Sequence, residues 1–364
     1  MADPAHTDPG RIDVHQHVIP PARGQAMTGR AAAVGWPAPA WDEPSALAMM
    51  DRRGIATGML SYAAPLAGPD DPATAREVAR SVNEFTAELV KNRPDRFGHF
   101  AVLPLPDVDG ALAEAAHALD ELDADGVLVL SNAHGRYLGD PAFEPLWAEL
   151  DARSAVILVH PTAPPGPPPA DVPLPLVDFP YDTTRAALHM TMRGVPRRYP
   201  RMRMILPHAG GFLPYAAQRF ALAARLHTDA SDGGGTTPED FLTDLRRFYF
   251  DIAISTGPAT LHALLAFAAP DHILYGSDFP MLPEDWGTGF DTALDAYPNW
   301  EPGRLHAVDR RQRRTPDSAA GPDTRDVTAV GPPRSTTYLR VSQCGPFINT
   351  VRVSMRRPRN TCAR

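Results

Sequence analysis

Five side chains that could bind a metal ion or move protons each follow a short apolar run. His15 and His17 end the first run, and because one residue separates them, both imidazoles project from the same side of a strand. His160, His208 and Asp278 follow later apolar runs. Imidazole and carboxylate groups suit a divalent transition-metal ion. Each residue could instead serve locally, as a histidine bonded to a loop or an aspartate capping a helix, but five in equivalent places indicate one site.

Short β-branched or apolar runs alternate with segments of helical spacing, which is typical of a parallel α/β fold. The predicted strands span residues 11–19, 54–63, 97–104, 125–132, 155–161, 203–209, 248–254 and 273–277. The predicted helices lie near 43–53, 73–92, 109–122, 142–153, 183–198, 212–227, 238–247 and 258–269. This order predicts an α/β fold of the (β/α)8 TIM-like barrel type, in which the carboxyl ends of the strands carry the active site. A doubly wound open sheet is the alternative, although no Gly-x-Gly-x-x-Gly follows the first strand.

Two long loops would leave strand ends on the predicted active-site face, at 20–41 and 162–181. The first contains Trp36 and Trp41, and the second is rich in proline. We expect both loops to shape or cover the pocket, with ordinary surface insertions as the alternative.

Composition limits the classes of protein. The chain has 364 residues, of which 43% are hydrophobic, and no long apolar run or signal peptide, so we expect a cytoplasmic protein without a membrane partner. Both cysteines, Cys344 and Cys362, lie near the C-terminus, which leaves nitrogen and oxygen as metal ligands. The 309 residues before Arg310 carry 23 basic and 40 acidic side chains, a balance that disfavours nucleic acid as a partner.

The motifs resemble the amidohydrolase superfamily (amidohydrolase family 2). They are most similar to its branch with aminocarboxymuconate semialdehyde decarboxylase and the non-oxidative aromatic-acid decarboxylases. The motifs at the site are His15-x-His17, His160, His208-Ala-Gly-Gly and Gly276-Ser-Asp278-Phe-Pro. Segments that look most like 6-methylsalicylate decarboxylases are 50–55, 96–99, 103–107, 135–140 and 182–186. The resemblance covers about residues 10–309.

This resemblance implies that His15, His17, His160 and Asp278 hold one divalent ion, Zn²⁺ or else Mn²⁺. It implies that His208 stands beside the ion as an acid, base or polarising group, and that Asp278 also donates a proton. No lysine ends the fourth predicted strand, so a second ion bridged by a carbamylated lysine is not expected. Members of the branch are often dimers, which makes a homodimer the expected assembly.

The implied reaction is loss of CO₂ from a small aromatic carboxylate such as 6-methylsalicylate. The ion would bind the carboxylate and its ortho hydroxyl, and an acid would protonate the ring carbon. Arg185 is the candidate for gripping the carboxylate, with a solvated helix charge as the alternative. His99 and His134 could reach the pocket or be structural. Two other functions stay open: a hydrolase of lactones or amides that activates water on the same ion, and an inactive barrel that only binds.

The alternation of apolar runs and helical segments stops after Asp309. This leaves a barrel domain of 1–309 and a C-terminal segment of 310–364. This segment holds 12 arginines and 3 aspartates without helical period, so we expect a basic, disordered tail. The resembling branch has a helix here that begins near Gly-Asn-Ala. One possible coding of 310–318, shifted by a single base, reads Ala-Gly-Asn-Ala-Ala-Leu-Leu-Thr. We therefore expect a frameshift that replaces the last barrel helix and leaves the first and last strands bare; a genuine tail for an acidic partner is the alternative.

Overall fold

The computed structural model describes residues 10–166, 171–222, 237–269 and 271–310. The chain divides into two units, Met1–Thr315 and Pro316–Arg364, and the second unit lies outside the described residues. The expectations for the tail at 311–364 therefore also lie outside them.

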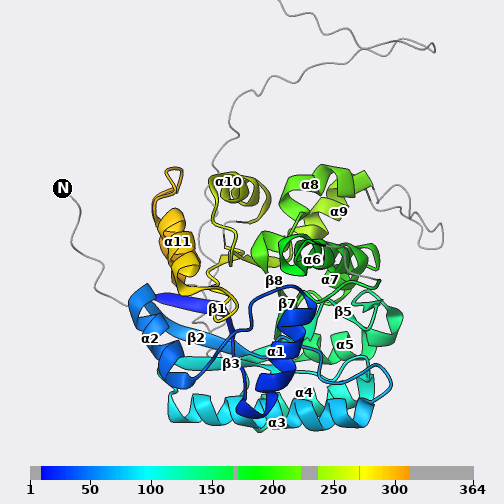
Figure 1. Cartoon of the computed structure of the whole chain (residues 1–364). Coiled ribbons are helices and arrows are strands. Elements are labelled where there is room, and N and C mark those ends of the chain that lie inside the picture. Colours follow the sequence, from blue (N-terminus) through cyan, green and yellow to red (C-terminus); the bar gives the residue numbers. More distant parts are fainter. Residues whose placement is uncertain (1–9, 167–170, 223–236, 270, 311–364) are drawn as a thin grey trace, which may run out of the picture. The chain divides into compact units, whose positions relative to one another are not determined.

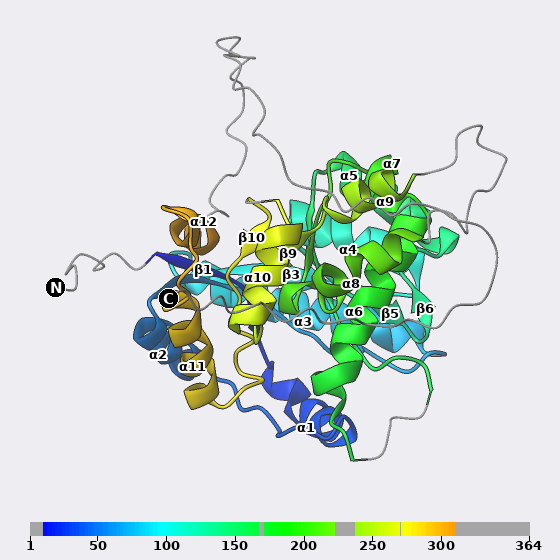
Figure 2. The same cartoon turned by 90° about the horizontal axis from the view of Figure 1, so that it is seen from above.

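Eight parallel strands form a nearly closed barrel, which confirms the predicted fold class (Figures 1 and 2). The strands, in their order around the sheet, are β1 (Arg11–His17), β2 (Ile55–Ser61), β3 (Phe97–Val102), β4 (Gly126–Leu130), β7 (Val156–His160), β8 (Arg203–Leu206), β9 (Tyr249–Asp251) and β10 (Ile273–Leu274). Backbone bonds connect the first strand to the last, since the Val14 N–H donates to the Tyr275 carbonyl at 3.0 Å. The carboxyl ends of all eight strands therefore meet on one rim.

Helices pack around the strands (Figure 2). They are α1 (Gly24–Ala33), α2 (Glu43–Arg53), α3 (Pro72–Asn92), α4 (Val108–Asp120), α5 (Glu144–Ala152), α6 (Leu174–Met192), α7 (Val195–Arg198), α8 (Leu213–Phe220), α9 (Pro238–Leu245), α10 (Pro258–Phe267), α11 (Glu284–Asp295) and α12 (Arg304–Arg310). A short hairpin of β5 (Asn132–Ala133) and β6 (Arg136–Tyr137) follows β4. No helix in the described ranges is both long and apolar enough to cross a bilayer.

Local signals explain why α2 forms where the sequence predicts it. The Asp42 side chain accepts from the Ser45 N–H at 2.7 Å, and the Ser45 side chain returns a bond to the Asp42 backbone. Pro44 sits in the first turn, where its missing N–H costs nothing. Gly54 ends the helix in the left-handed conformation, at φ 66°.

α1 and the first part of α6 lie in the segments 20–41 and 162–181, which the sequence predicts to be loops. The predicted loops are therefore too long. The first loop contains α1, and α6 begins at Leu174 rather than near 183. In α6, Pro175 occupies the first turn, where proline is tolerated, and Pro180 lies inside the helix. The start of α6 is held where Leu174 is buried and its N–H donates to the Val34 carbonyl at 3.0 Å.

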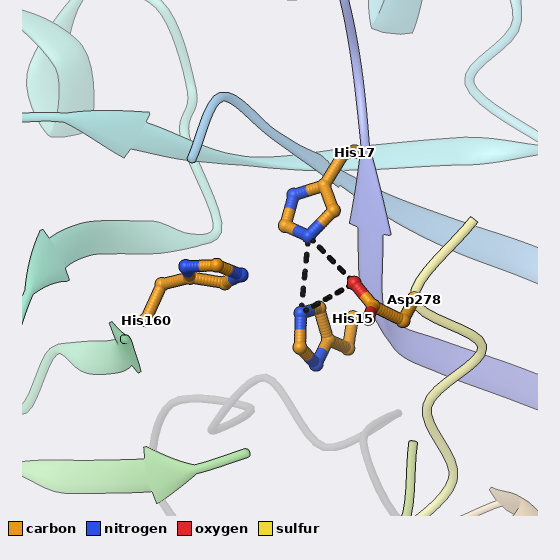
Figure 3. Close-up of side chains that lie close together, drawn as sticks. All are labelled: His15, His17, His160 and Asp278. Atoms are coloured by element: carbon orange, nitrogen blue, oxygen red, sulfur yellow. Dashed lines mark hydrogen bonds and ion pairs between the residues drawn. The ribbon is translucent and has the colours of Figure 1, made fainter. Parts of the chain in front are cut away.

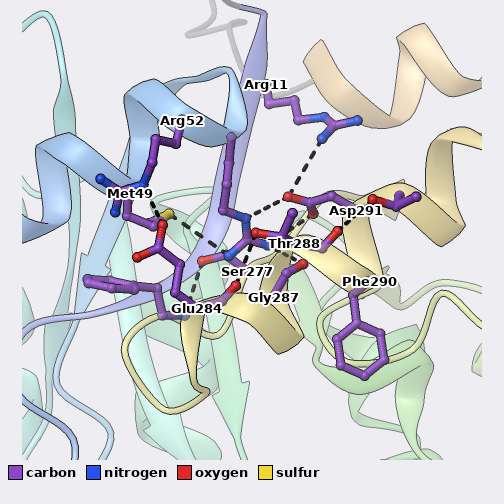
Figure 4. Close-up of polar contacts among 12 residues, drawn as sticks. Arg11, Met49, Arg52, Ser277, Glu284, Gly287, Thr288, Phe290 and Asp291 are labelled. Carbon is purple, nitrogen blue, oxygen red and sulfur yellow. Dashed lines mark hydrogen bonds and ion pairs between the residues drawn. The ribbon is translucent and has the colours of Figure 1, made fainter.

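A charged cluster fixes the last helices against β1 and α2 (Figure 4). Arg53 of α2 forms a bidentate pair with Asp291 of α11, at 2.6 and 3.0 Å, and the Tyr275 hydroxyl donates to the same carboxylate at 2.9 Å. Arg11 of β1 pairs with Asp309 at 3.1 Å. The start of α12 contacts β1 and β10, and its Val308 is buried. α12 therefore covers part of the first and last strands, which we expected to be bare.

Candidate metal centre

The barrel brings the side chains of His15, His17, His160 and Asp278 to one point on the rim (Figure 3). The two β1 histidines and His160, the last residue of β7, approach from different walls of the barrel, and Asp278 follows β10. Their ligand-type atoms lie within 4.8 Å of one another, and all four residues are buried. These are the four residues that the motif resemblance assigns to a metal ion.

Short distances join the ligand-type atoms. The Nε2 atoms of His15 and His17 are 3.1 Å apart. Asp278 Oδ1 lies 3.1 Å from His17 Nε2 and 3.3 Å from His15 Nε2. The ring centroids of His17 and His160 are 4.8 Å apart. Spacings of this size fit side chains arranged around a common ion.

The outer nitrogens of the three imidazoles determine which tautomers are present. His15 Nδ1 lies 3.0 Å from Asp251 Oδ2, and His160 Nδ1 lies 2.7 Å from the Pro161 carbonyl. Both oxygens only accept, so each Nδ1 carries the proton. His17 Nδ1 lies 3.2 Å from Ser61 Oγ, which donates its own proton to the Gln16 carbonyl. Ser61 therefore accepts from His17 as well.

In the neutral form of each ring the Nε2 lone pair therefore faces the cluster, which also holds the Asp278 carboxylate. Groups that all present electron pairs repel one another unless a cation lies between them. Three imidazole nitrogens and a carboxylate oxygen form a ligand set of the kind that binds Zn²⁺ or a related divalent ion. This buried group could therefore bind a metal.

The pKa values show how strongly these buried groups act on one another. Burial acts to lower the pKa of His15, but the carboxylates of Asp251 and Asp278 outweigh it and raise this pKa to about 9. Burial acts to raise the pKa of Asp278, but the charge of His15 and the His17 and His208 rings hold it well below its ordinary value. Burial lowers the pKa of both His17 and His160.

Asp251, which the sequence reasoning missed, connects the metal cluster to His208. While Oδ2 faces His15, Oδ1 accepts from the backbone N–H groups of His208 at 3.1 Å and Ala253 at 3.0 Å. Asp251 ends β9, so its place at a strand end was the available signal. Ser61 ends β2 in the same way.

His208 stands beside the cluster on a tight turn. Its Nε2 lies 3.5 Å from Asp278 Oδ2. Four consecutive residues have positive φ values, 55° at His208, 57° at Ala209, 72° at Gly210 and 64° at Gly211. A Cβ atom at Gly211 would lie 2.2 Å from the Pro180 carbonyl oxygen, so only glycine fits there. The His-Ala-Gly-Gly motif therefore reflects the backbone path that brings the His208 ring to Asp278.

A cavity of about 450 Å³ opens over the cluster. His160, His208 and Asp278 line it, together with mainly apolar residues. Met27 and Trp36 come from the first predicted loop, and Leu176 and Phe179 from the second. The Trp36 indole donates to the Met281 carbonyl at 2.6 Å, which ties the first loop to the segment after β10. The expectation that both loops shape the pocket is confirmed.

The other candidate residues lie apart from this cavity. Arg185 is exposed, donates to the Tyr181 hydroxyl at 2.6 Å and lines a different cavity. His134 is also exposed and lines a further cavity, above β2 to β4. His99 is buried in β3, where burial lowers its pKa despite the nearby Asp125. The structure therefore does not bring these three residues to the metal cluster.

Comparisons with known proteins show what this chain is similar to. A family model described as amidohydrolase matches residues 12–315. A 6-methylsalicylic acid decarboxylase from Penicillium expansum is 40% identical over 301 residues, which cover 79% of this chain and 90% of the relative. A solved amidohydrolase II structure is 31% identical with a TM-score of 0.76 and covers 83% of this chain and 97% of its own. A dihydroxybenzoic acid decarboxylase from Polaromonas, crystallised with manganese, shares the fold at 22% identity and a TM-score of 0.67, over 83% of this chain and 95% of its own.

Proposed function

The chain belongs to the amidohydrolase family, and on this basis we propose that it is a metal-dependent carboxy-lyase. Its substrate is a small aromatic acid with an ortho hydroxyl group, such as 6-methylsalicylate. The observation that carries this proposal is the convergence of three Nε2 lone pairs and the Asp278 carboxylate beneath an apolar cavity. The similarity to a 6-methylsalicylic acid decarboxylase supports the choice of substrate.

We assign the ion to His15, His17, His160 and Asp278, one ion in all. When bound, it supplies a positive charge that orients the substrate carboxylate and ortho hydroxyl and withdraws electrons from them. The ligand set suits Zn²⁺ and Mn²⁺ alike. The Polaromonas decarboxylase with the same fold holds manganese, which makes Mn²⁺ a serious candidate beside Zn²⁺.

Asp278 and His208 handle the proton. Decarboxylation replaces the ring–carboxylate bond by a ring–hydrogen bond, so one proton must reach the ring carbon while the electrons of the broken bond return to the ring. Asp278 faces the cavity and is the donor to carbon. His208, with Nε2 3.5 Å from Asp278 Oδ2, supplies the proton to Asp278 and receives its replacement from solvent.

The cavity walls do the remaining work. Phe179 and Met281 are among the apolar side chains that surround the space above the cluster. Such walls bury an aromatic ring favourably and keep bulk water from the reacting carbon.

The test is incubation of purified protein, loaded separately with Zn²⁺ and Mn²⁺, with 6-methylsalicylate. We expect equimolar CO₂ and 3-methylphenol, and loss of turnover in His208→Asn without loss of bound metal. Elemental analysis should find about one ion per chain. Hydrolysis of an aromatic lactone with no CO₂ from 6-methylsalicylate would contradict the proposal in favour of a hydrolase. If the protein holds well under one metal ion per chain and turns over neither substrate, a binding role is favoured.

A further inference from the structure

Arg30 stands between two parts of the barrel mouth. It lies on α1 and lines the cavity that also holds His160, His208 and Asp278. It also lines a second cavity of about 530 Å³ above the ends of β2 to β4. The second loop approaches it as well, since Arg30 Nη2 donates to Thr162 Oγ1 at 3.3 Å.

The guanidinium of Arg30 lacks a counter-charge. Over the part of the chain that the structure describes, Arg30 makes no ion pair, and the bond to Thr162 engages one of its five N–H groups. Other enclosed arginines are paired: Arg53 binds Asp291, and Arg11 binds Asp309. Burial lowers the pKa of Arg30 to about 10, against a small opposing effect of Tyr62. Arg30 is only partly buried, and the N–H groups that do not contact Thr162 can donate to an anionic ligand.

We propose that Arg30, which lines the metal-site cavity, binds the carboxylate of the substrate with its remaining N–H groups. This inference rests on the proposed function, because it takes an aromatic carboxylate as the ligand. Guanidinium and carboxylate form paired, charge-assisted hydrogen bonds. Arg30 therefore takes the role that the sequence suggested for Arg185, which is exposed and lines another cavity.

The placement also explains how substrate and product are told apart. The substrate brings a negative charge that compensates Arg30, whereas 3-methylphenol, formed when CO₂ leaves, is neutral and brings none. Arg30 therefore favours binding of the carboxylate and not of the phenol. Uncharged analogues such as 6-methylsalicylamide lack the same compensation and bind weakly.

The experiment compares Arg30→Gln, Arg30→Lys and Arg185→Gln with the wild-type holoenzyme. Arg52→Gln, which removes an exposed guanidinium paired with Glu284, is the matched control. For Arg30→Gln we expect KM for 6-methylsalicylate to rise about 10- to 100-fold, the usual weight of a charged hydrogen-bonded contact. The inhibition constant of 3-methylphenol should change less than about threefold, and Arg30→Lys should lie between Gln and wild type.

Three results would overturn the assignment. The first is an unchanged KM in Arg30→Gln. The second is a rise in KM of about 10- to 100-fold in Arg185→Gln instead. The third is a parallel rise in the 3-methylphenol inhibition constant, which would indicate a structural role. If Arg30→Gln does not fold, as judged by circular dichroism, Arg30→Lys is tested in its place. The assignment is then rejected if Arg30→Lys has the wild-type KM for 6-methylsalicylate and the wild-type preference for 6-methylsalicylate over 6-methylsalicylamide.

Failure of the proposed function has a different signature. If wild-type protein releases no CO₂, calorimetry with 6-methylsalicylate on the metal-loaded protein still measures binding. A Kd that rises about tenfold or more in Arg30→Gln supports Arg30 as an anion-binding residue and rejects the reaction alone. Equal Kd values in the two proteins reject Arg30.

Discussion

Replacing Asp251 by Asn should weaken metal binding without removing any proposed ligand. Asp251 Oδ2 accepts from His15 Nδ1 at 3.0 Å, which leaves the lone pair on Nε2 for the ion. Oδ1 is committed to the N–H groups of His208 and Ala253, so the Asn oxygen must stay there and its NH₂ group must face His15. Two donors then oppose each other, and His15 relieves the clash by moving its proton to Nε2, where it blocks the ion.

Loss of an outer partner of a metal-bound histidine typically lowers affinity 10- to 100-fold. This corresponds to about 1.4 to 2.7 kcal/mol of binding free energy. The assay is competition for Zn²⁺ and Mn²⁺ against a chelator of known affinity at pH 7, with metal content checked by elemental analysis. Turnover at saturating metal should recover in part, because the four ligands remain.

The matched control is Asp291→Asn. Asp291 is also a buried aspartate, but it pairs with Arg53 and not with the metal cluster. This variant should lose about 3 to 5 kcal/mol of unfolding free energy, because it leaves Arg53 without its charge partner, and should bind metal like wild type. A metal Kd for Asp251→Asn within twofold of the wild-type value would refute the tautomer argument.

Three further predictions concern pH, the His208 turn and the C-terminal segment. Burial lowers the pKa of His99, so this side chain resists protonation in the folded protein. The free energy of unfolding is therefore unaffected by His99 above about pH 6.5 and falls below that pH, by up to about 1.4 kcal/mol per pH unit. Urea unfolding at pH 7.5 and 5.5 should show a smaller difference in His99→Leu than in wild type, and equal differences would exclude His99 as the cause. Gly211→Ala places a Cβ against the Pro180 carbonyl and should abolish turnover, whereas Gly24→Ala, with nothing within 4 Å of its Cβ, should not; an active Gly211→Ala enzyme would show that the turn tolerates a side chain. We propose that residues 310–364 are a frameshift product: a gene restored to the other frame near codon 310 should yield more soluble and more active protein, and equal behaviour of both would count against it.

The amino-acid sequence by itself determined the barrel and where the ligand-type residues stand in it. Apolar runs separated by helical segments predicted all eight strands, because each run records the burial of one strand in its own residues. His160 and Asp278 were found because they directly follow such runs. The predicted range of 43–53 agrees with the bounds of α2, whose capping residues are its immediate neighbours in the chain.

Only the tertiary structure decided which partners these residues have. Asp251 meets His15 across 236 positions, and no local pattern records that contact. Arg185 has the spacing of a helix residue near the pocket, yet its helix begins at Leu174 and presents it to solvent, while Arg30 of the unpredicted α1 reaches the cavity. The physical reason is that strand and helix periodicity is encoded by adjacent residues. The side chains that meet at the rim depend instead on how the closed barrel and its covering helices pack.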